Sequence, residues 1–196
     1  MHSAINPLAE GATVRYVLVA EESAFVAQAF ATGLLSAFAH SPKIAIRNFE
    51  GEAEFTASGA RLENAHLHLR IPADSLEVID GASESDREEI NRRTRDEVLE
   101  TDRFSEIVYD SSKVTGSGNG NRYWLALSGE LTLRGITRTM PVSAKVIVNG
   151  NSLRATGDFQ IRQSDFGIPP VTAAAGTIRL KDEVKCTFDI LARIPD

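Results

Sequence analysis

The chain has 196 residues, of which 42% are hydrophobic, and it carries a formal net charge of −6 at pH 7. Such an acidic chain, without a concentrated basic face, argues against a nucleic-acid partner and against electrostatic docking on anionic membranes. Its single cysteine, Cys186, excludes an intramolecular disulfide and lies on the apolar face of a predicted strand, where we expect an inert core thiol. The length suits one domain with a sizeable core.

The N-terminal region predicts neither a leader nor a membrane span. Residues 1–13 lack a basic stretch followed by an apolar one, so we expect no secretory signal and a cytoplasmic location, or a periplasmic one if a leader precedes this sequence. Residues 24–39 are uncharged and mostly apolar, but the segment is short for a span and is interrupted by Gly33. It predicts instead a strand at residues 23–30 followed by a short helix or turn.

Three further strands are predicted in the first third of the chain. Alternation of apolar and polar residues places successive side chains on opposite faces, and it predicts strands at residues 14–20, 43–48 and 53–58. A further strand runs up to Pro72, which lacks the N–H that regular pairing needs. Its predicted inner face consists of Ala65, Leu67, Leu69 and Ile71, and its outer face of His66, His68 and Arg70.

Residues 83–104 are dense in charge and have helical spacing. Residues 85–88 read Ser-Asp-Arg-Glu, which predicts a capping box in which the serine oxygen accepts a backbone N–H and the glutamate reaches back. Two pairs of opposite charge are spaced four residues apart, Glu88 with Arg92 and Glu89 with Arg93. A narrow apolar stripe is formed by Ile90, Thr94, Val98 and Leu99. We therefore predict one helix on the outside of the fold, attached by a thin seam, with its charges in water.

The C-terminal half contains the clearest alternation. Glycine and asparagine predict a flexible hairpin tip at residues 115–121 and a compact turn at residues 149–151, and residues 164–176 are irregular. The apolar positions between these breaks share one face of each strand: Tyr123, Leu125, Leu127, Gly129, Leu131 and Leu133, then Val142, Ala144, Val146 and Val148, then Leu153, Ala155, Gly157, Phe159 and Ile161, and finally Val184, Cys186, Phe188 and Ile190. Such strands predict an antiparallel sandwich or barrel whose interior is either a filled core or a container for an apolar molecule.

Few residues suggest chemistry, and the sequence contains no G-x-S-x-G motif and no P-loop. His66 and His68 are half of a metal site without evident further ligands, so we predict that both face water and that the chain holds no metal. His40 is a candidate general acid or head-group contact, or else a capping or core histidine. Arg162 and Asp165 either form a polar cluster at a barrel mouth or simply bond the irregular loop around them.

Several segments, taken together and in this order, resemble the YceI-like, polyisoprenoid-binding family. They are His40 followed by residues 49–52 (FEGE), residues 103–107 (RFSEI), residues 128–138 (SGELTLRGITR), residues 161–168 (IRQSDFGI) and residues 176–184 (GTIRLKDEV). Each piece alone is short, but the combination is specific, and the resemblance extends over residues 16–192.

This resemblance implies an all-β, lipocalin-like antiparallel barrel of about eight strands with one amphipathic helix packed outside. Residues 14–196 would form the barrel domain, after an extension at residues 1–13. The family's long apolar tunnel holds an isoprenoid or other lipid-like chain and needs no cofactor. Strands of about ten residues span roughly 33 Å, which suits an extended tail. The small inward residues Gly129, Ala144, Ala155 and Gly157 would leave room for that tail.

The leading hypothesis is therefore a non-enzymatic carrier or sequestering protein for an amphipathic, lipid-like molecule. We expect the tail to contact Leu67, Leu69, Leu125, Leu127, Val146, Phe159 and Phe188, and the head group to meet His40, Arg162 and Asp165. One alternative is an enzyme that acts on a lipidic substrate with His40 as acid–base. Another is a packed barrel that serves as an interaction module through its helix or the tip at residues 116–120. A homodimer through sheet edges or the helix is left open.

Overall fold

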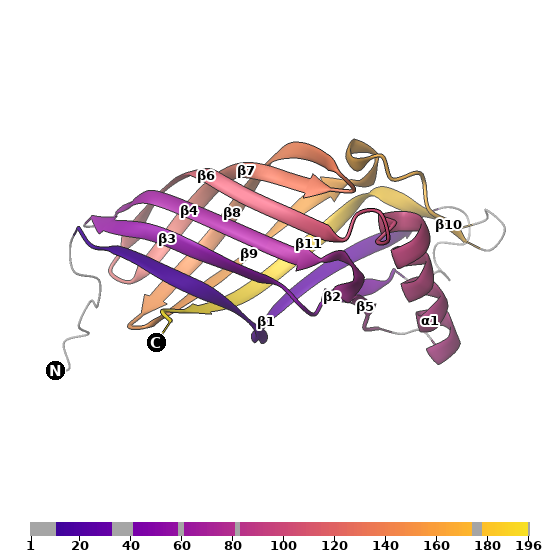
Figure 1. Ribbon diagram of the computed structural model, residues 1–196, viewed down its shortest axis with the longest axis horizontal. Coiled ribbons are helices and arrows are strands. Elements are labelled where there is room, and N and C mark those ends of the chain that lie inside the picture. Colours follow the sequence, from indigo (N-terminus) through magenta and orange to yellow (C-terminus); the bar gives the residue numbers. More distant parts are fainter. Residues whose placement is uncertain (1–10, 33–40, 59–60, 81–82, 174–177, 196) are drawn as a thin grey trace.

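The computed structural model describes residues 11–32, 41–58, 61–80, 83–173 and 178–195. Within them, eight antiparallel strands form a barrel, which the pairing of the last strand with the first closes (Figure 1). Around the ring these are β1 (Thr13–Thr32), β3 (Glu50–Ser58), β4 (Arg61–Pro72), β6 (Glu106–Asn119), β7 (Arg122–Leu133), β8 (Ile136–Asn149), β9 (Ser152–Arg162) and β11 (Ile178–Arg193). The predicted all-β, lipocalin-like barrel is confirmed.

The first strand differs from the prediction of two separate strands at residues 14–20 and 23–30. β1 runs unbroken for 20 residues, and its pairing with β11 is irregular between Val19 and Ala24. Ser23 bridges this irregularity, because its hydroxyl donates to the Val19 carbonyl at 2.6 Å and accepts from the Leu191 N–H at 2.9 Å. The side chain thus replaces ladder bonds that the bulge removes, and the strand continues.

Several short elements gather at one end of the barrel, at the right in Figure 1. They are β2 (Lys43–Ile46), the 3₁₀ turn Ala73–Ser75, β5 (Leu76–Val78), the 3₁₀ turn Gln163–Phe166 and β10 (Thr172–Ala173). β2 takes over from β3 as the partner of the second half of β1, and β5 pairs with β2. β5 was not predicted, because three residues are too few to display an alternating pattern.

The inward faces are those that the alternation predicts. On β7, for example, Tyr123, Leu127 and Leu131 are buried while Trp124 is 52% exposed. On β8 the side chains of Ala144, Val146 and Val148 are buried, as are those of Cys186, Phe188 and Ile190 on β11. The alternation therefore fixes which side chains enter the barrel.

The predicted hairpin tip at residues 115–121 is confirmed in place, but its predicted extent is wrong. β6 continues to Asn119, Gly116 pairs with Leu125 and Gly118 pairs with Tyr123, so the turn itself is confined to residues 120–121. A Cβ atom added to Gly118 would collide with the Tyr123 ring. This glycine is therefore a packing position inside the ladder, although its residue type is typical of a turn.

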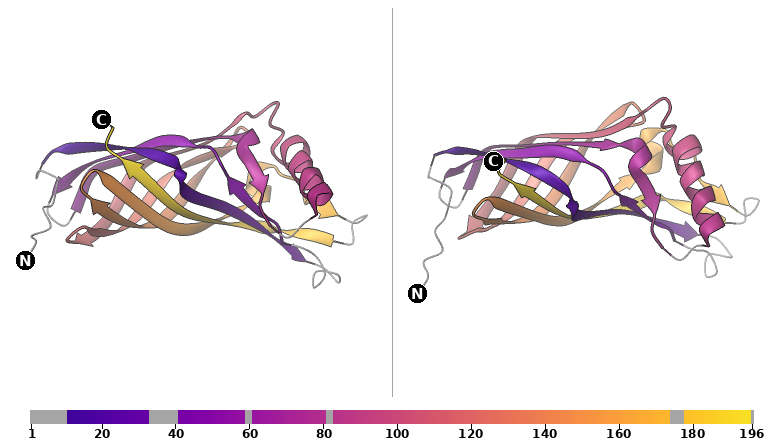
Figure 2. Two further views of the ribbon diagram at one scale, coloured as in Figure 1. Left: turned by 90° about the horizontal axis from the view of Figure 1, so that it is seen from below. Right: turned by 60° about the horizontal axis from the view of Figure 1, so that its bottom comes forward.

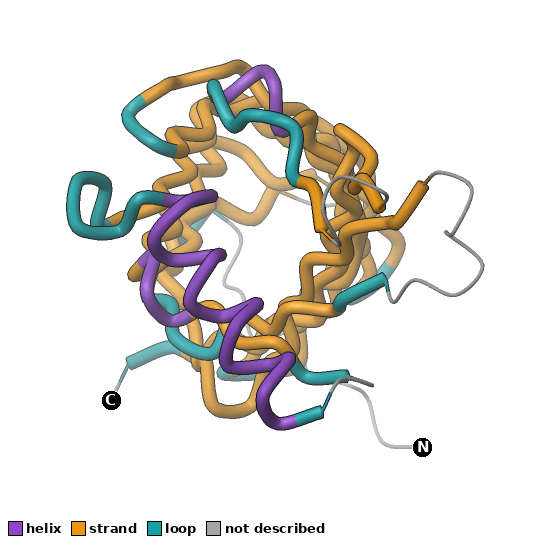
Figure 3. Tube along the Cα trace, turned by 90° about the vertical axis from the view of Figure 1, so that its right-hand side faces the viewer, coloured by secondary structure: helices purple, strands orange, loops and turns teal. Residues whose placement is uncertain are grey.

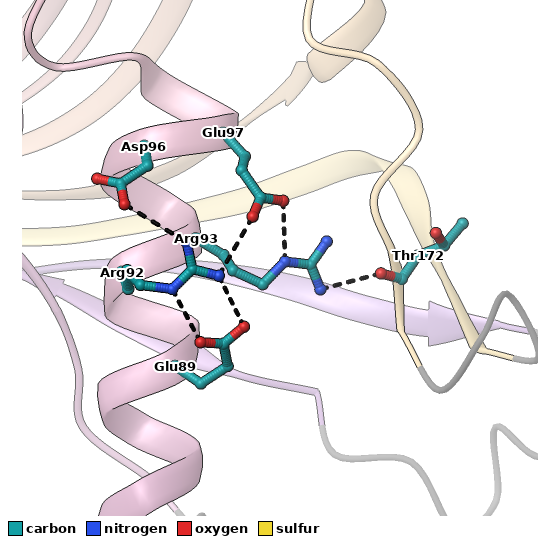
Figure 4. Close-up of polar contacts among 6 residues, drawn as sticks. All are labelled: Glu89, Arg92, Arg93, Asp96, Glu97 and Thr172. Carbon is teal, nitrogen blue, oxygen red and sulfur yellow. Dashed lines mark hydrogen bonds and ion pairs between the residues drawn. The ribbon is translucent and has the colours of Figure 1, made fainter.

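The helix begins two residues earlier than the predicted capping box. α1 (Glu84–Arg93) is capped by Ser83, whose Oγ accepts from the Asp86 N–H at 3.2 Å, and it continues through a π-helical turn (Thr94–Leu99). The predicted pairs of Glu88 with Arg92 and of Glu89 with Arg93 are replaced by others. Two arginines form the observed ion pairs, Arg92 with Glu89, Asp96 and Glu97, and Arg93 with Glu97 (Figure 4).

α1 lies outside the barrel, as predicted, and it crosses one of the two ends. Figure 3 looks into that end, with the helix in front of part of the opening, and Figure 2 shows the same placement from two further directions. The stripe side chains Ile90, Thr94 and Val98 turn toward the barrel interior, and Leu99 is 6% exposed. The thin apolar seam therefore faces an opening in the barrel and not its outer wall.

Candidate functional site

The half of the barrel interior next to α1 contains a cavity of about 930 Å³. This volume lies in the range of about 300–1,000 Å³ that is typical of small-molecule sites. Its walls are almost entirely apolar, with side chains such as Ala29, Ile44, Leu69, Ile71, Leu133, Ile161, Leu180 and Val184. The cavity is therefore suited to an apolar group.

The cavity ends at a floor about half-way through the barrel. Its deepest lining residues, strand by strand, are Phe25, Leu67, Tyr109, Leu131, Val142, Phe159 and Ile190. Three phenylalanines form one cluster there: the ring of Phe25 is 6.3 Å from that of Phe159 and 6.4 Å from that of Phe188, between ring centroids. Phe159 and Phe188 are also 6.4 Å apart. Edge-on and tilted contacts of this kind stabilise a rigid layer.

The other half of the barrel is filled with side chains. Tyr16 and Tyr123 are 0% and 2% exposed, and the ring of Tyr16 stacks on that of Phe55 with 5.6 Å between centroids. Further buried residues complete this half, namely Leu127, Ala144, Val146, Val148, Leu153 and Ala192. The interior is thus a filled core at one end and a container at the other, where the sequence posed these as alternatives.

The expectation that small inward residues leave room for a tail is corrected at two glycines. A Cβ atom on Gly129 would come 2.8 Å from Cζ of Tyr109, and one on Gly157 would come 2.6 Å from Cζ of Phe188. The space that these glycines leave is therefore occupied by aromatic rings from the neighbouring strands. Gly157 and Phe188 are direct partners in the ladder between β9 and β11. These two glycines shape the floor and do not extend the cavity.

Polar groups line the cavity at its mouth. Asp86, Glu89 and Arg93 come from α1, and Gln163 and Thr172 come from the segments that follow β9. Arg93 is fixed from two sides, because Nε donates to Glu97 at 3.0 Å and Nη1 donates to the Thr172 carbonyl at 3.0 Å (Figure 4). The amide of Gln163 donates to the Lys181 carbonyl at 2.9 Å. The mouth therefore offers both donors and acceptors to a polar group.

The deeper polar atoms carry no charge near neutral pH. Burial raises the pKa of the Cys186 thiol and of the Tyr109 hydroxyl to about 12 each, because the charged forms would lose their hydration. The Tyr109 hydroxyl donates to the Met140 carbonyl at 3.0 Å, which satisfies its hydrogen. The deep wall thus combines apolar side chains with neutral polar groups.

The residues predicted to contact a tail divide between the two halves. Leu67, Leu69, Phe159 and Phe188 line the cavity. Leu125, Leu127 and Val146 face inward as well but belong to the filled half and do not line it. The alternation of apolar and polar residues shows which side chains face inward. Whether an inward side chain lines the cavity or belongs to the filled half depends on its depth along the barrel.

Two of the residues predicted to meet a head group, Arg162 and Asp165, do not line the cavity. Arg162 has a side chain that is 65% exposed and lies 3.9 Å from Glu183 on the outer surface, and Asp165 is also exposed. Gln163, between them, lines the cavity because it shares the inward parity of Phe159 and Ile161. That parity could have identified Gln163 from the sequence. His40 lies outside the described residues.

The two histidines of β4 face outward, as predicted. Nδ1 of His68 lies 2.6 Å from Oδ1 of Asp110, and Nδ1 of His66 lies 2.6 Å from the Ser111 carbonyl oxygen. Across the part of the chain that the structure describes, no group of three or more His, Cys, Asp or Glu side chains is placed to hold a metal ion. In the same residues, no helix has the length and apolar character needed to cross a membrane.

Comparison with known sequences identifies relatives of this chain. A family model described as the YceI-like domain matches residues 16–192. A UPF0312 protein of Vibrio campbellii is 31% identical over 100 residues, which cover 47% of this chain and 51% of the relative. A UPF0312 protein of Shewanella oneidensis is 32% identical over 127 residues, 62% of this chain and 61% of the relative. The matched region thus spans between half and two thirds of these relatives.

Solved structures share the fold at low sequence identity. BcnA of Burkholderia cenocepacia has a TM-score of 0.68 at 18% identity, covering 89% of this chain and 98% of its own. A polyisoprenoid binding domain from Saccharophagus degradans, implicated in plant cell wall breakdown, has a TM-score of 0.65 at 15% identity, covering 93% and 99%. Both likenesses support the same barrel architecture.

Proposed function

The chain belongs to the YceI-like family, and from this membership and the cavity we propose that it binds an amphipathic, lipid-like molecule with its tail inside the barrel. The observation that carries the proposal is the apolar cavity of about 930 Å³, closed at its floor and polar at its mouth. A similar protein is described as a polyisoprenoid binding domain, which favours an isoprenoid chain, and a fatty-acyl chain has the same chemistry.

The binding energy would come from burial of the tail. Each Å² of apolar surface removed from water contributes about 25 cal/mol, reduced by the costs of association. Because the wall is already formed and its deep polar groups are neutral, an apolar chain would meet neither unpaired charge nor a need to rearrange the strands. A charged group would have to stay at the mouth.

The head group would lie near Arg93, Gln163 and the acidic side chains of α1. Because donors and acceptors are mixed there, a hydroxyl or amide, which can both donate and accept, fits this mouth better than a group of one charge. We further propose that the protein holds the molecule as a carrier or sequestering protein. In support, the Tyr109 hydroxyl is bonded to a carbonyl and the Cys186 thiol is neutral, so neither is prepared to attack a ligand.

A pair of tryptophan substitutions on β1 tests the site. Ala27 lines the cavity, and the neighbouring Gln28 lies on the opposite face of the same strand. Ala27→Trp would fill part of the cavity and is expected to abolish binding of a fluorescent fatty-acid analogue, while Gln28→Trp is expected to leave it unchanged. Binding that survives Ala27→Trp in a folded protein would place the ligand elsewhere.

A further inference from the structure

We propose that the aromatic floor makes this cavity selective for chain length, so that short isoprenoid or acyl chains fill it and long polyisoprenoid chains gain nothing further. This inference rests on the function proposed above and adds the class of chain. It follows from the position of the floor, its rigidity and the volume above it.

The distance from the mouth to the floor differs between the walls of the cavity. On β9 the lining runs from Phe159 to Gln163, and on β4 from Leu67 to Ile71, four residues of strand in each case. At about 3.3 Å per residue this is about 13 Å, against roughly 33 Å for a strand of ten residues. The cavity is therefore much shorter than the barrel on these two walls, whereas on β11 the lining runs from Leu180 to Ile190, ten residues or about 33 Å of strand.

The floor is held from below and from the sides. Phe188 lies over Gly157 and Tyr109 over Gly129, so each ring fills a space that its neighbouring strand leaves. Beneath them the filled half contains Tyr16, which is 0% exposed. Close-packed interiors of this kind do not open without loss of many contacts. A tail that reaches the rings cannot continue toward the other end unless they move.

The volume sets an upper limit on the chain. A cavity of about 930 Å³ holds about 30 groups of the size of a water molecule, at roughly 30 Å³ each, which is also approximately the space of one methylene group. The limit is thus about 30 carbon atoms for complete filling. Isoprenoid chains of a few units fit, whereas a longer polyisoprenoid would leave the part beyond about 30 carbon atoms in water at the mouth.

The test is a chain-length series bound to the wild-type protein: geraniol, farnesol, geranylgeraniol and solanesol, each displacing a fluorescent fatty-acid analogue. Below the limit, affinity should rise by about fourfold for each additional buried methylene group. A prenol of about 30 carbon atoms is added to the series at the limit, and solanesol, with about 45 carbon atoms, should bind no better than that prenol. Affinity that keeps rising to solanesol would overturn chain-length selection while leaving the proposed function intact. Failure of every member to bind would overturn both.

Two variants move the floor in opposite directions. Phe188→Ala removes part of the floor and should shift the optimum to longer chains. Val142→Phe adds a ring at the deepest lining position of β8 and should shift it to shorter chains. Phe55→Ala removes a similar ring in the filled half, away from the cavity, and should leave the optimum where it is. If Phe188→Ala fails to fold, Val142→Phe still decides, because an unchanged optimum in that variant contradicts the inference.

Discussion

The ring of Phe188 covers Gly157 on the neighbouring strand, where a Cβ atom would lie 2.6 Å from the phenyl Cζ. This pair joins two features that appear unrelated in the sequence, a glycine that weakens a strand and an aromatic residue that ends a cavity. Because the ring fills the glycine's space, β9 and β11 approach closely at the level where the interior changes from filled to open. The position of that boundary determines what the barrel can hold.

Gly157→Ala tests this packing directly. The added methyl group would meet both the Phe188 ring and the Ser143 carbonyl oxygen, so we expect a loss of about 2 kcal/mol in the free energy of unfolding, as for an overpacked core. Urea denaturation measures this loss. Thr156→Ala, on the outer face of the same strand, is the control and should change stability by less than about 0.5 kcal/mol. Equal effects of the two substitutions would contradict the packing described.

Arg93 is predicted to hold α1 over the mouth through the Thr172 carbonyl. Arg93→Met removes that bond, and we expect the opening equilibrium of α1 to rise by a factor of about five, for a bond worth about 1 kcal/mol at this partly exposed site. Hydrogen–deuterium exchange of residues 84–99 measures it. Arg92→Met is the matched control, because the partners of Arg92 among the described residues, Glu89, Asp96 and Glu97, all belong to the same helical segment. Identical exchange in both variants would exclude the contact with Thr172 as an anchor.

The segment after the helix is fixed by a second arginine. The Arg134 side chain is 11% exposed, pairs with Glu100 and donates to the Gly167 carbonyl at 2.8 Å. Arg134→Ala leaves Glu100 without this partner and should cost about 1–3 kcal/mol of stability. Arg103 pairs with the same carboxylate but is 71% exposed, so Arg103→Ala should cost less than about 1 kcal/mol. Thermal unfolding of the two variants compares them, and the reverse order would be inconsistent with a buried pair.

The buried thiol of Cys186 should make the free energy of unfolding decrease in alkaline solution. Burial raises its pKa from the ordinary 9.0 to about 12 in the folded chain. The stabilisation of the folded chain by the buried, protonated thiol is therefore complete below pH 9. It is lost as the pH rises toward 12, because the thiol of the unfolded chain releases its proton at lower pH than that of the folded chain. The loss is about 1.4 kcal/mol for each pH unit in that window. Cys186→Ala should show a flatter profile of unfolding free energy between pH 9 and 11, and parallel profiles would show that the thiol ionises equally well in the folded chain.

Much of the fold could be predicted, because alternation is a local property of a strand. The inward positions from Tyr123 to Leu133 follow from period two alone. The start of the helix is less determined, since Ser83 and Ser85 are each followed by an acidic residue three positions later. The division of the interior could not be predicted, because it depends on Tyr109 and Phe188 filling the spaces at Gly129 and Gly157, two contacts between residues distant in sequence.

The mouth was less predictable than the wall. Arg162 and Asp165 were predicted at the mouth because they are charged, yet both lie on the outer surface. The uncharged Gln163 between them faces the cavity. The contributions of Asp86, Glu89 and Arg93 depend on α1 crossing an end of the barrel, which no local pattern specifies. A helix with a thin apolar stripe fits a wall as well as an opening.

Native mass spectrometry of the freshly purified protein, followed by organic extraction, shows whether the cavity of the barrel holds a ligand. We expect either a discrete added mass that extracts as an apolar chain, or a mass shift of that kind when farnesol or a fatty alcohol is added. Ala27→Trp should lose the added mass and Gln28→Trp should retain it. A bare protein mass that no prenyl or fatty-acyl compound changes would contradict a ligand-binding cavity and leave the barrel as an interaction module.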